Sequence, residues 1–340
     1  MYYSYHISFT LAVSLLLFWV SAHANTSNLD PQPLLLLNSL SLSHNPPLQP
    51  SGLSICENRI LMVSDNKNSA IFQILPENKN KSLSIFQTIS VSPPAFPEHL
   101  PLSHIFQSIL ASFFSGKTYD WEGITCDTKG NIYLASEAFF NIAKIDSSGH
   151  AQWILPNIYA SGRQQELFQV YNGGIEGLAW KDDRMLYIAA ERSERGILAA
   201  QITEEGWELS KVLSIPKTSI KNQTSRPQDF AGLWQEGAYL FTLERNNFLV
   251  CRRSINRLDI ERCWSYRHIE NAEIFRYNDT EFGIAEGLAR QKNKLYIVVD
   301  NNKKARVNNR TDTAPILMIY QLPEDWLTAI PSSELQSLSN

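Results

Sequence analysis

Acidic side chains recur at fixed places in a repeated sequence motif, and they are the residues of this chain that could do chemistry. In four of the five copies an acid stands close to a glycine, and in all five an apolar run follows and a second acid ends the next apolar run. The clearest copies run from Trp121 to Glu137, from Ile175 to Glu191 and from Ala285 to Asp300. Less regular copies run from Ser51 to Asp65 and from Asp229 to Glu244.

The spacing predicts that the two acids of each copy meet. In a two-stranded hairpin, the start of the first strand and the end of the second lie side by side. Nine of the ten positions brought together in this way are acidic, and the tenth is Ser51. The nine carboxylates belong to Asp65, Glu122, Glu137, Glu176, Glu191, Asp229, Glu244, Glu286 and Asp300. Like charges at such density repel, so they require cations, protons or fixed basic partners.

Hard oxygen ligands with no His or Cys cluster nearby suit Ca²⁺ better than Zn²⁺. We therefore predict that the nine carboxylates bind Ca²⁺, which would polarise a phosphoryl or acyl group while a carboxylate acts as base. The candidate catalytic residues are Glu122, Glu176 and Glu286 together with Arg192 and Arg245, which each follow a ring acid directly. The alternative is that each carboxylate simply accepts backbone N–H bonds and links neighbouring repeats.

Other catalytic signatures are missing from the sequence. It has no Gly-x-Ser-x-Gly elbow, no His-Glu-x-x-His and no phosphate-binding glycine loop, and its seven histidines are scattered. A serine esterase mechanism is therefore unsupported, and metal-assisted hydrolysis remains.

The period of the motif indicates which elements must position these acids. The pivotal glycines are Gly52, Gly123, Gly177, Gly232 and Gly287. They are about 71, 54, 55 and 55 residues apart, which is typical of propeller blades rather than of helical repeats. We predict an all-β, five-bladed β-propeller, with six blades as the alternative. Because inner strands line the channel of a propeller, the acids should form a ring at one mouth.

Two further segments complete the predicted architecture. The last copy has only three strand-like runs, so we predict that residues 34–42 supply its outer strand by pairing with residues 316–321, which closes the ring. A long interruption between the first two copies has apolar residues at helical intervals over about 98–114, which predicts a short helical insertion. That helix would either pack on the propeller surface or cover a site.

The N-terminus predicts export. An apolar run, residues 11–20, is followed by Ala-x-Ala ending at Ala24, so residues 1–24 are interpreted as a signal peptide and residues 25–340 as a single propeller domain, periplasmic or secreted. The stretch before the apolar run has no Lys or Arg, which leaves an uncleaved anchor as the alternative.

Export makes disulfides plausible. We expect Cys251 and Cys263 to bridge within one hairpin, whereas Cys56 and Cys126 could be bridged or free thiols.

Composition limits the partners. The formal net charge of −4 gives no electrostatic footprint for nucleic acid. We expect a monomer without a membrane span after signal cleavage, acting on a small phosphorylated or ester substrate or binding an exported protein.

The series of motifs from Trp-Glu-Gly-Ile at residue 121 to Val-Asp-Asn-Asn at residue 299 resembles the bacterial phytase-like family, which is named for an esterase-like activity of phytase. It is similar also to SdiA-regulated β-propeller proteins, and the resemblance extends over about residues 50–322. It implies an exported propeller, calcium-dependent, that hydrolyses phosphoesters or esters. The alternative is a non-enzymatic propeller that binds a ligand or protein through the same face.

Overall fold

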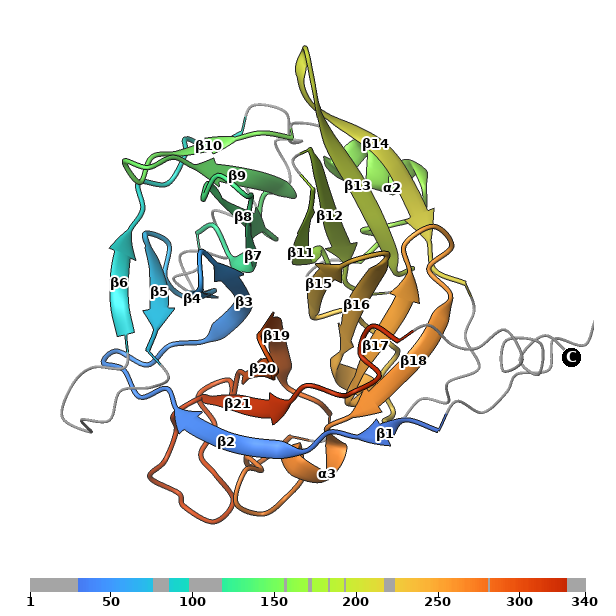
Figure 1. Ribbon diagram of the computed structural model, residues 1–340. Coiled ribbons are helices and arrows are strands. Elements are labelled where there is room, and N and C mark those ends of the chain that lie inside the picture. The colour runs from blue at the N-terminus through green and yellow to red at the C-terminus, as the bar shows by residue number, and fades with distance from the viewer. Residues whose placement is uncertain are drawn as a thin grey trace, which may run out of the picture. The chain divides into compact units, whose positions relative to one another are not determined.

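A computed structural model of the chain describes residues 30–75, 86–97, 118–155, 158–170, 173–182, 184–192, 194–216, 224–280 and 282–328. These residues form five antiparallel sheets around one axis (Figure 1). The predicted five-bladed propeller is therefore confirmed, and six blades are not needed. The predicted signal peptide, residues 1–24, and the helix predicted at about 98–114 lie outside the described residues.

Each blade runs from an inner strand on the axis to an outer strand. Blade 1 consists of β3 (Pro50–Cys56), β4 (Arg59–Ser64), β5 (Ala70–Ile74) and β6 (Phe86–Ser90). Blade 2 consists of β7 (Trp121–Cys126), β8 (Ile132–Ser136), β9 (Asn141–Ile145) and β10 (Ala151–Trp153). Blade 3 consists of β11 (Ile175–Lys181), β12 (Met185–Ala190), β13 (Gly196–Thr203) and β14 (Gly206–Ser214).

Blades 4 and 5 contain the strands that come from the N-terminal side. Blade 4 consists of β15 (Gly232–Glu236), β16 (Tyr239–Glu244), β17 (Leu249–Ser254) and β18 (Ile260–Ser265), with β1 (Gln32–Pro33) added in parallel to β18. Blade 5 consists of β19 (Ala285–Gln291), β20 (Lys294–Val299), β21 (Ile316–Gln321) and β2 (Leu36–Ser41). The described helices are α2 (Ile158–Gln164), α3 (Arg267–Glu270) and the 3₁₀ turn η1 (Arg245–Asn247).

The pivotal glycines allow neighbouring inner strands to approach each other closely. A Cβ atom added to Gly52 would lie 2.5 Å from the carbonyl oxygen of Glu122, and one added to Gly123 would lie 2.7 Å from that of Glu176. Any side chain at these positions would therefore push two blades apart. The apolar residues of the inner and second strands fill the space between blades, as in β12, where every residue from Leu186 to Ala190 is buried.

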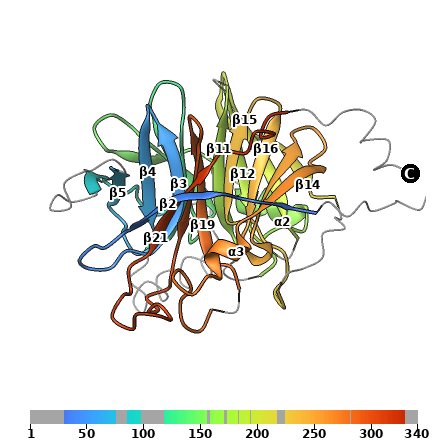
Figure 2. The same cartoon turned by 60° about the horizontal axis from the view of Figure 1, so that its bottom comes forward.

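The N-terminal strand closes the ring as predicted. Strand β2 pairs antiparallel with β21, with Leu36 opposite Tyr320 and Ser41 opposite Ile316. Figures 1 and 2 both show β2 beside β21, and Figure 1 shows the chain between β2 and β1, which lies beside β18. This pairing covers the edge of β21, which blade 5 would otherwise expose.

A second contact joins blade 5 to blade 4. After β21 the chain places the indole of Trp326, which is buried, flat against Phe241 of β16 at a ring separation of 3.8 Å. Arg252 Nη1 donates to the carbonyl oxygen of Trp326 at 3.0 Å, and the Trp326 indole N–H donates to Glu236 Oε2 at 3.0 Å. The segment after β21 is thus fixed on blade 4.

Both cysteine pairs form disulfides. Cys251 and Cys263 face each other on β17 and β18, as predicted. Cys56 and Cys126, for which the sequence left free thiols open, bridge the ends of inner strands β3 and β7 with Cα atoms 5.8 Å apart. Both bridges accord with an oxidising compartment. Among the described residues, none of the helices has the length and apolar character needed to traverse a bilayer.

Candidate functional site

Most of the predicted ring acids meet in one cavity. It has a volume of about 340 Å³ and is lined by residues at the starts of inner strands and the ends of second strands. The predicted carboxylates that line it are Asp65, Glu122, Glu137, Glu176, Glu286 and Asp300. Its basic lining residues are Arg192, Arg226, Arg245 and Lys304. Three predicted ligands, Glu191, Asp229 and Glu244, are buried behind this wall instead.

A β-bulge positions the first acid of the motif. In blades 2 and 5 the strand register shifts at Glu122 and Glu286, and in blade 3 it shifts across Glu176 and Gly177. A bulged residue has no partner in the ladder and its side chain is turned out of the regular alternation. Blade 1 has the same bulge with Ser51 at that place, and its hydroxyl donates to the carbonyl oxygen of Trp121 in blade 2.

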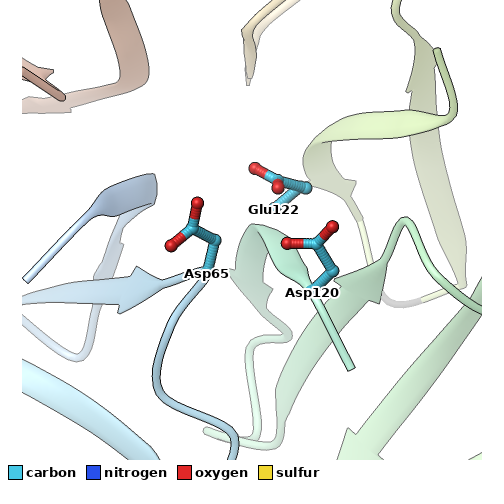
Figure 3. Close-up of side chains that lie close together, drawn as sticks. All are labelled: Asp65, Asp120 and Glu122. Atoms are coloured by element: carbon cyan, nitrogen blue, oxygen red, sulfur yellow. The ribbon is translucent and has the colours of Figure 1, made fainter. Parts of the chain in front are cut away.

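One compact group of acids comes from blades 1 and 2. Carboxylate oxygens of Asp65, Asp120 and Glu122 lie within 4.8 Å of one another. Figure 3 shows the three carboxylates converging from the end of β4 and the start of β7. Asp65 and Glu122 are buried, and Asp120 is half-buried.

Sequence reasoning missed Asp120. The equivalent position in three other motif copies is Gln49, Gly174 or Ile284, so the repeat carries no signal for an acid there. An available signal was its closeness to Glu122 in the sequence, although Asp120 has a positive φ of 48° and Glu122 lies at the bulge, so strand alternation does not explain the pairing. The Asp-x-Glu pair nevertheless places two carboxylates together without help from any other blade.

A second group consists of Glu137, Glu176 and Glu191, whose carboxylate oxygens also lie within 4.8 Å of one another. Glu191 is already neutralised, because Arg192 Nε donates to its Oε2 at 2.6 Å and Arg245 donates to its Oε1. Glu137 Oε1 accepts the backbone N–H of Gly174 at 2.9 Å, the blade-linking role that we considered as an alternative. Glu176 differs, since its buried Oε2 has no hydrogen-bond partner among the described residues.

Arg245 holds one side of the cavity together. Its Nε donates to Asp229 Oδ2 at 2.6 Å, and its two Nη groups donate to Glu191 and Glu286. Burial lowers the pKa of Arg245, but Glu286, Asp229 and Glu191 raise it by more, so the net pKa lies well above the ordinary value. This guanidinium therefore acts as a permanent counter-ion for three of the predicted ligands.

Glu244 belongs to a separate buried network. It accepts hydrogen bonds from Arg253 Nη2 at 2.5 Å and from Arg195 Nη1 at 3.2 Å. Burial raises the pKa of Glu244, but Arg253 and Arg195 lower it by more, and the net pKa is below the ordinary value. The structure thus gives Glu244 two fixed guanidinium partners away from the cavity.

The carboxyls on the cavity wall behave in the opposite way. Burial, followed by repulsion from Glu176 and from other neighbouring carboxylates, raises the pKa of Glu122 well above its ordinary value. Burial, followed by repulsion from Glu191, likewise raises the pKa of Glu176 well above its ordinary value. Burial is also the largest cause for Glu137 and Glu286, whose pKa values rise to about 8. These groups need protons or a cation at neutral pH.

The two acidic groups differ in how well their oxygen atoms could bind a cation. Asp65, Asp120 and Glu122 offer hard carboxylate oxygens that lie within 4.8 Å of one another. Such a set suits Ca²⁺. The group around Glu191 suits it poorly, because two guanidinium groups already hold that carboxylate.

The fold and the cavity define a β-propeller with a carboxylate-lined site on its axis. The family model described as Phytase-like, esterase-like activity of phytase, matches residues 50–303. The chain therefore belongs to this family, as its motifs predicted. The comparison with curated protein sequences gave no match.

Several solved structures resemble the chain at low sequence identity. Glutaminyl cyclase from Myxococcus xanthus is 8% identical with a TM-score of 0.50, and the match covers 85% of this chain and 98% of that one. A gluconolactonase from Xanthomonas campestris is 8% identical with a TM-score of 0.42, covering 86% and 96%. Virginiamycin B lyase from Staphylococcus aureus is 10% identical with a TM-score of 0.40, covering 85% and 75%. Only the first of these likenesses, at a TM-score of 0.50, bears on the fold, and at 8% identity it bears on nothing else.

Proposed function

We propose that this chain is an exported, Ca²⁺-dependent hydrolase of phosphoesters or carboxylic esters. The observation that carries the proposal is the buried Oε2 atom of Glu176, which has no hydrogen-bond partner among the described residues and belongs to a residue that lines the same cavity as Asp65 and Glu122. Asp120 lies beside these two acids, with carboxylate oxygens of all three within 4.8 Å of one another. A buried charged oxygen without a partner is unfavourable, so it points to a proton or a cation in the working protein. Membership of the phytase-like family supports the same chemistry.

Asp65, Asp120 and Glu122 would hold the cation. When bound, Ca²⁺ would supply the positive charge that polarises a phosphoryl or carbonyl oxygen. Glu176 would carry a proton at Oε2, because burial and the neighbouring Glu191 raise its pKa. A protonated carboxyl can give its proton to a leaving oxygen, and the carboxylate that remains can then take a proton from water.

The two arginines of the prediction receive different roles. Arg192 lines the cavity with a partly exposed guanidinium, so it remains the candidate for contact with substrate oxygens. Arg245 is held by three carboxylates, and its role is to fix Glu286 and Glu191 in place. Glu286 would thereby keep a fixed orientation at the cavity wall.

Export is part of the proposal. Two disulfides within the described residues and an apolar run ending in Ala-x-Ala at residue 24 support an oxidising destination, periplasmic or extracellular.

The test combines binding with turnover. Calorimetric titration with Ca²⁺ is expected to show binding by the wild-type chain and none by Asp65→Asn or Glu122→Gln, whereas Glu208→Gln, which changes an exposed carboxylate on β14, should bind normally. The same proteins would be assayed on a panel of phosphomonoesters and carboxylic esters with Ca²⁺ and with chelator. Turnover that is present with Ca²⁺ and lost with chelator supports the proposal.

A non-enzymatic binding propeller is the second candidate. It is favoured by the three internal contacts of Arg245, which neutralise part of the acidic ring without any ligand. Ca²⁺ binding without turnover of any ester on the panel would favour this candidate, and absence of both would remove the hydrolase.

A further inference from the structure

The cationic side chains that line the cavity differ in whether a carboxylate already holds them. Arg245 bonds to Asp229, Glu191 and Glu286, and Arg192 bonds to Glu191. Arg226 makes no ion pair with any carboxylate among the residues that the structure describes. Its positive charge is therefore available to a ligand, whereas the charges of Arg192 and Arg245 are already paired with carboxylates.

An aromatic ring holds the Arg226 side chain in place. Its guanidinium carbon lies 3.6 Å from the centroid of the Phe282 ring, and both residues line the cavity. A guanidinium at this height over a ring gains cation–π attraction while its N–H donors, which lie in its own plane, stay free. Contact with Phe282 thus orients Arg226 and leaves its hydrogen-bonding edge uncommitted.

A second available cation lies on the same cavity. Lys304 Nζ is 3.6 Å from Asp279 Oδ2, but the side chains of the two residues are 46% and 81% exposed. An ion pair with this exposure is weak and is readily exchanged for another anion. Its neighbour Lys303 is exposed and does not line the cavity.

We propose that Arg226, stacked on Phe282, is the residue that binds the phosphate group of the substrate, with Lys304 assisting. The inference rests on the proposed function, because it assumes a phosphorylated substrate in this cavity. A flat guanidinium with free N–H donors can form two parallel hydrogen bonds to phosphate oxygens. Arg226 precedes blade 4, and Phe282 and Lys304 lie in the loops before β19 and after β20. The proposed cation ligands come instead from blades 1 and 2. The cavity therefore separates anion recognition from cation binding.

The test measures binding of inorganic phosphate by calorimetry, with and without Ca²⁺, so that no turnover is required. Relative to wild type, Arg226→Gln is expected to weaken phosphate binding on the order of tenfold, and Arg226→Lys to recover only part of the loss because an ammonium cannot make the paired bonds. Phe282→Leu should weaken it by about threefold, since the charge remains and only the stacking is lost.

Matched controls come from the same chain. Arg257→Gln removes an exposed arginine outside the cavity, and Lys303→Gln removes the lysine next to Lys304. Both should bind phosphate like wild type, whereas Lys304→Gln should bind it more weakly. Equal affinities for Arg226→Gln and Arg257→Gln, or no phosphate binding by wild type, would overturn the proposal.

The result separates the two levels of inference. Phosphate binding that depends on Arg226 in a chain without hydrolytic activity would support this assignment and remove the hydrolase. Ca²⁺-dependent hydrolysis with unchanged KM and phosphate affinity in Arg226→Gln would support the hydrolase and remove this assignment.

Discussion

Arg245 Nε donates to Asp229 Oδ2 at 2.6 Å, and this hydrogen bond fixes the guanidinium between the buried Glu191 and the half-buried Glu286. We expect Arg245→Met to lower the free energy of unfolding by about 3–5 kcal/mol at about pH 8, because removing one partner leaves buried carboxylates uncompensated. The loss should shrink at about pH 5, because burial raises the pKa of Glu286 to about 8 and this carboxyl is then protonated and no longer pairs with the guanidinium. Urea unfolding at both pH values measures it, with Arg257→Met, whose side chain is 74% exposed, as the control. A loss that does not change with pH would contradict this account.

Glu270 provides a pH-dependent term in stability. It is 4% exposed, its Oε1 accepts the Ile284 N–H at 2.9 Å, and burial raises its pKa to about 8 despite that bond. A raised folded-state pKa means that the stabilisation is fully present below the ordinary value and is lost as the pH rises through about 8. Glu270→Gln should therefore match wild type at about pH 5 and exceed it at about pH 9. Urea unfolding of both proteins tests this, and equal differences at the two pH values would refute it.

Glu244 is expected to matter for stability and not for Ca²⁺. Glu244→Gln should cost about 3 kcal/mol, because Arg253, which is fully buried, loses its charged partner. Its calorimetric Ca²⁺ affinity should stay at the wild-type value, in contrast to Glu122→Gln. A Glu244→Gln variant that loses Ca²⁺ would return this residue to the ligand set predicted from the sequence.

The two disulfides should differ in their contribution. The Cys56–Cys126 bridge closes a sequence separation of 70 residues and the Cys251–Cys263 bridge one of 12. The chain-entropy model gives about 4 kcal/mol for the first and about 3 kcal/mol for the second. The paired Cys→Ala variants would be compared by denaturant unfolding in oxidising buffer, and again in reductant to subtract the effect of the substitutions themselves. A larger oxidised-state loss for the hairpin pair would contradict the model.

Strand β2 is expected to be indispensable for a monomeric ring. Deletion of residues 34–43 removes the outer strand of blade 5 and exposes the edge of β21. The deleted protein should aggregate, because an unpaired edge offers N–H and C=O groups to another chain. Light scattering and thermal melting measure the effect. A monomeric protein with an unchanged melting temperature would show that closure by β2 is dispensable.

Much of the fold could be predicted because the repeat is physically necessary. A glycine such as Gly123 recurs in each blade, because the backbone of the neighbouring inner strand leaves no room for a Cβ atom. The spacing of these glycines along the sequence therefore marks the inner strands. The missing strand of the last blade likewise had to come from elsewhere, and an alternating apolar run near residue 36 was the available candidate. The repeat also located the bulged acids, since Glu122 and Glu286 occupy the same register shift.

The division of the acids between cavity and interior could not be predicted. It depends on which guanidinium groups form ion pairs with which carboxylates of other blades. Arg245 of blade 4, for example, pairs with Glu191 of blade 3 and Glu286 of blade 5. These contacts join residues far apart in sequence and follow no repeat. Asp120 was missed for a related reason, because it occurs in one copy only. The stacking of Arg226 on Phe282 joins two segments outside the strands, which the strand pattern cannot place.

The way in which the ring is closed also determines how it would respond to mechanical load. Leu36 and Tyr320 are paired at the same end of the β2–β21 ladder, so tension entering there would open the hydrogen bonds one after another rather than shear them together. Two contacts would have to break before tension reached that end of the ladder. The β1–β18 pair anchors the chain before β2, and Trp326 anchors the chain after β21 to Phe241. A force applied through residues 30 and 328 would therefore act first on the contacts with blade 4. It would act on the β2–β21 ladder only after the β1–β18 pair and the Trp326 contact had both broken.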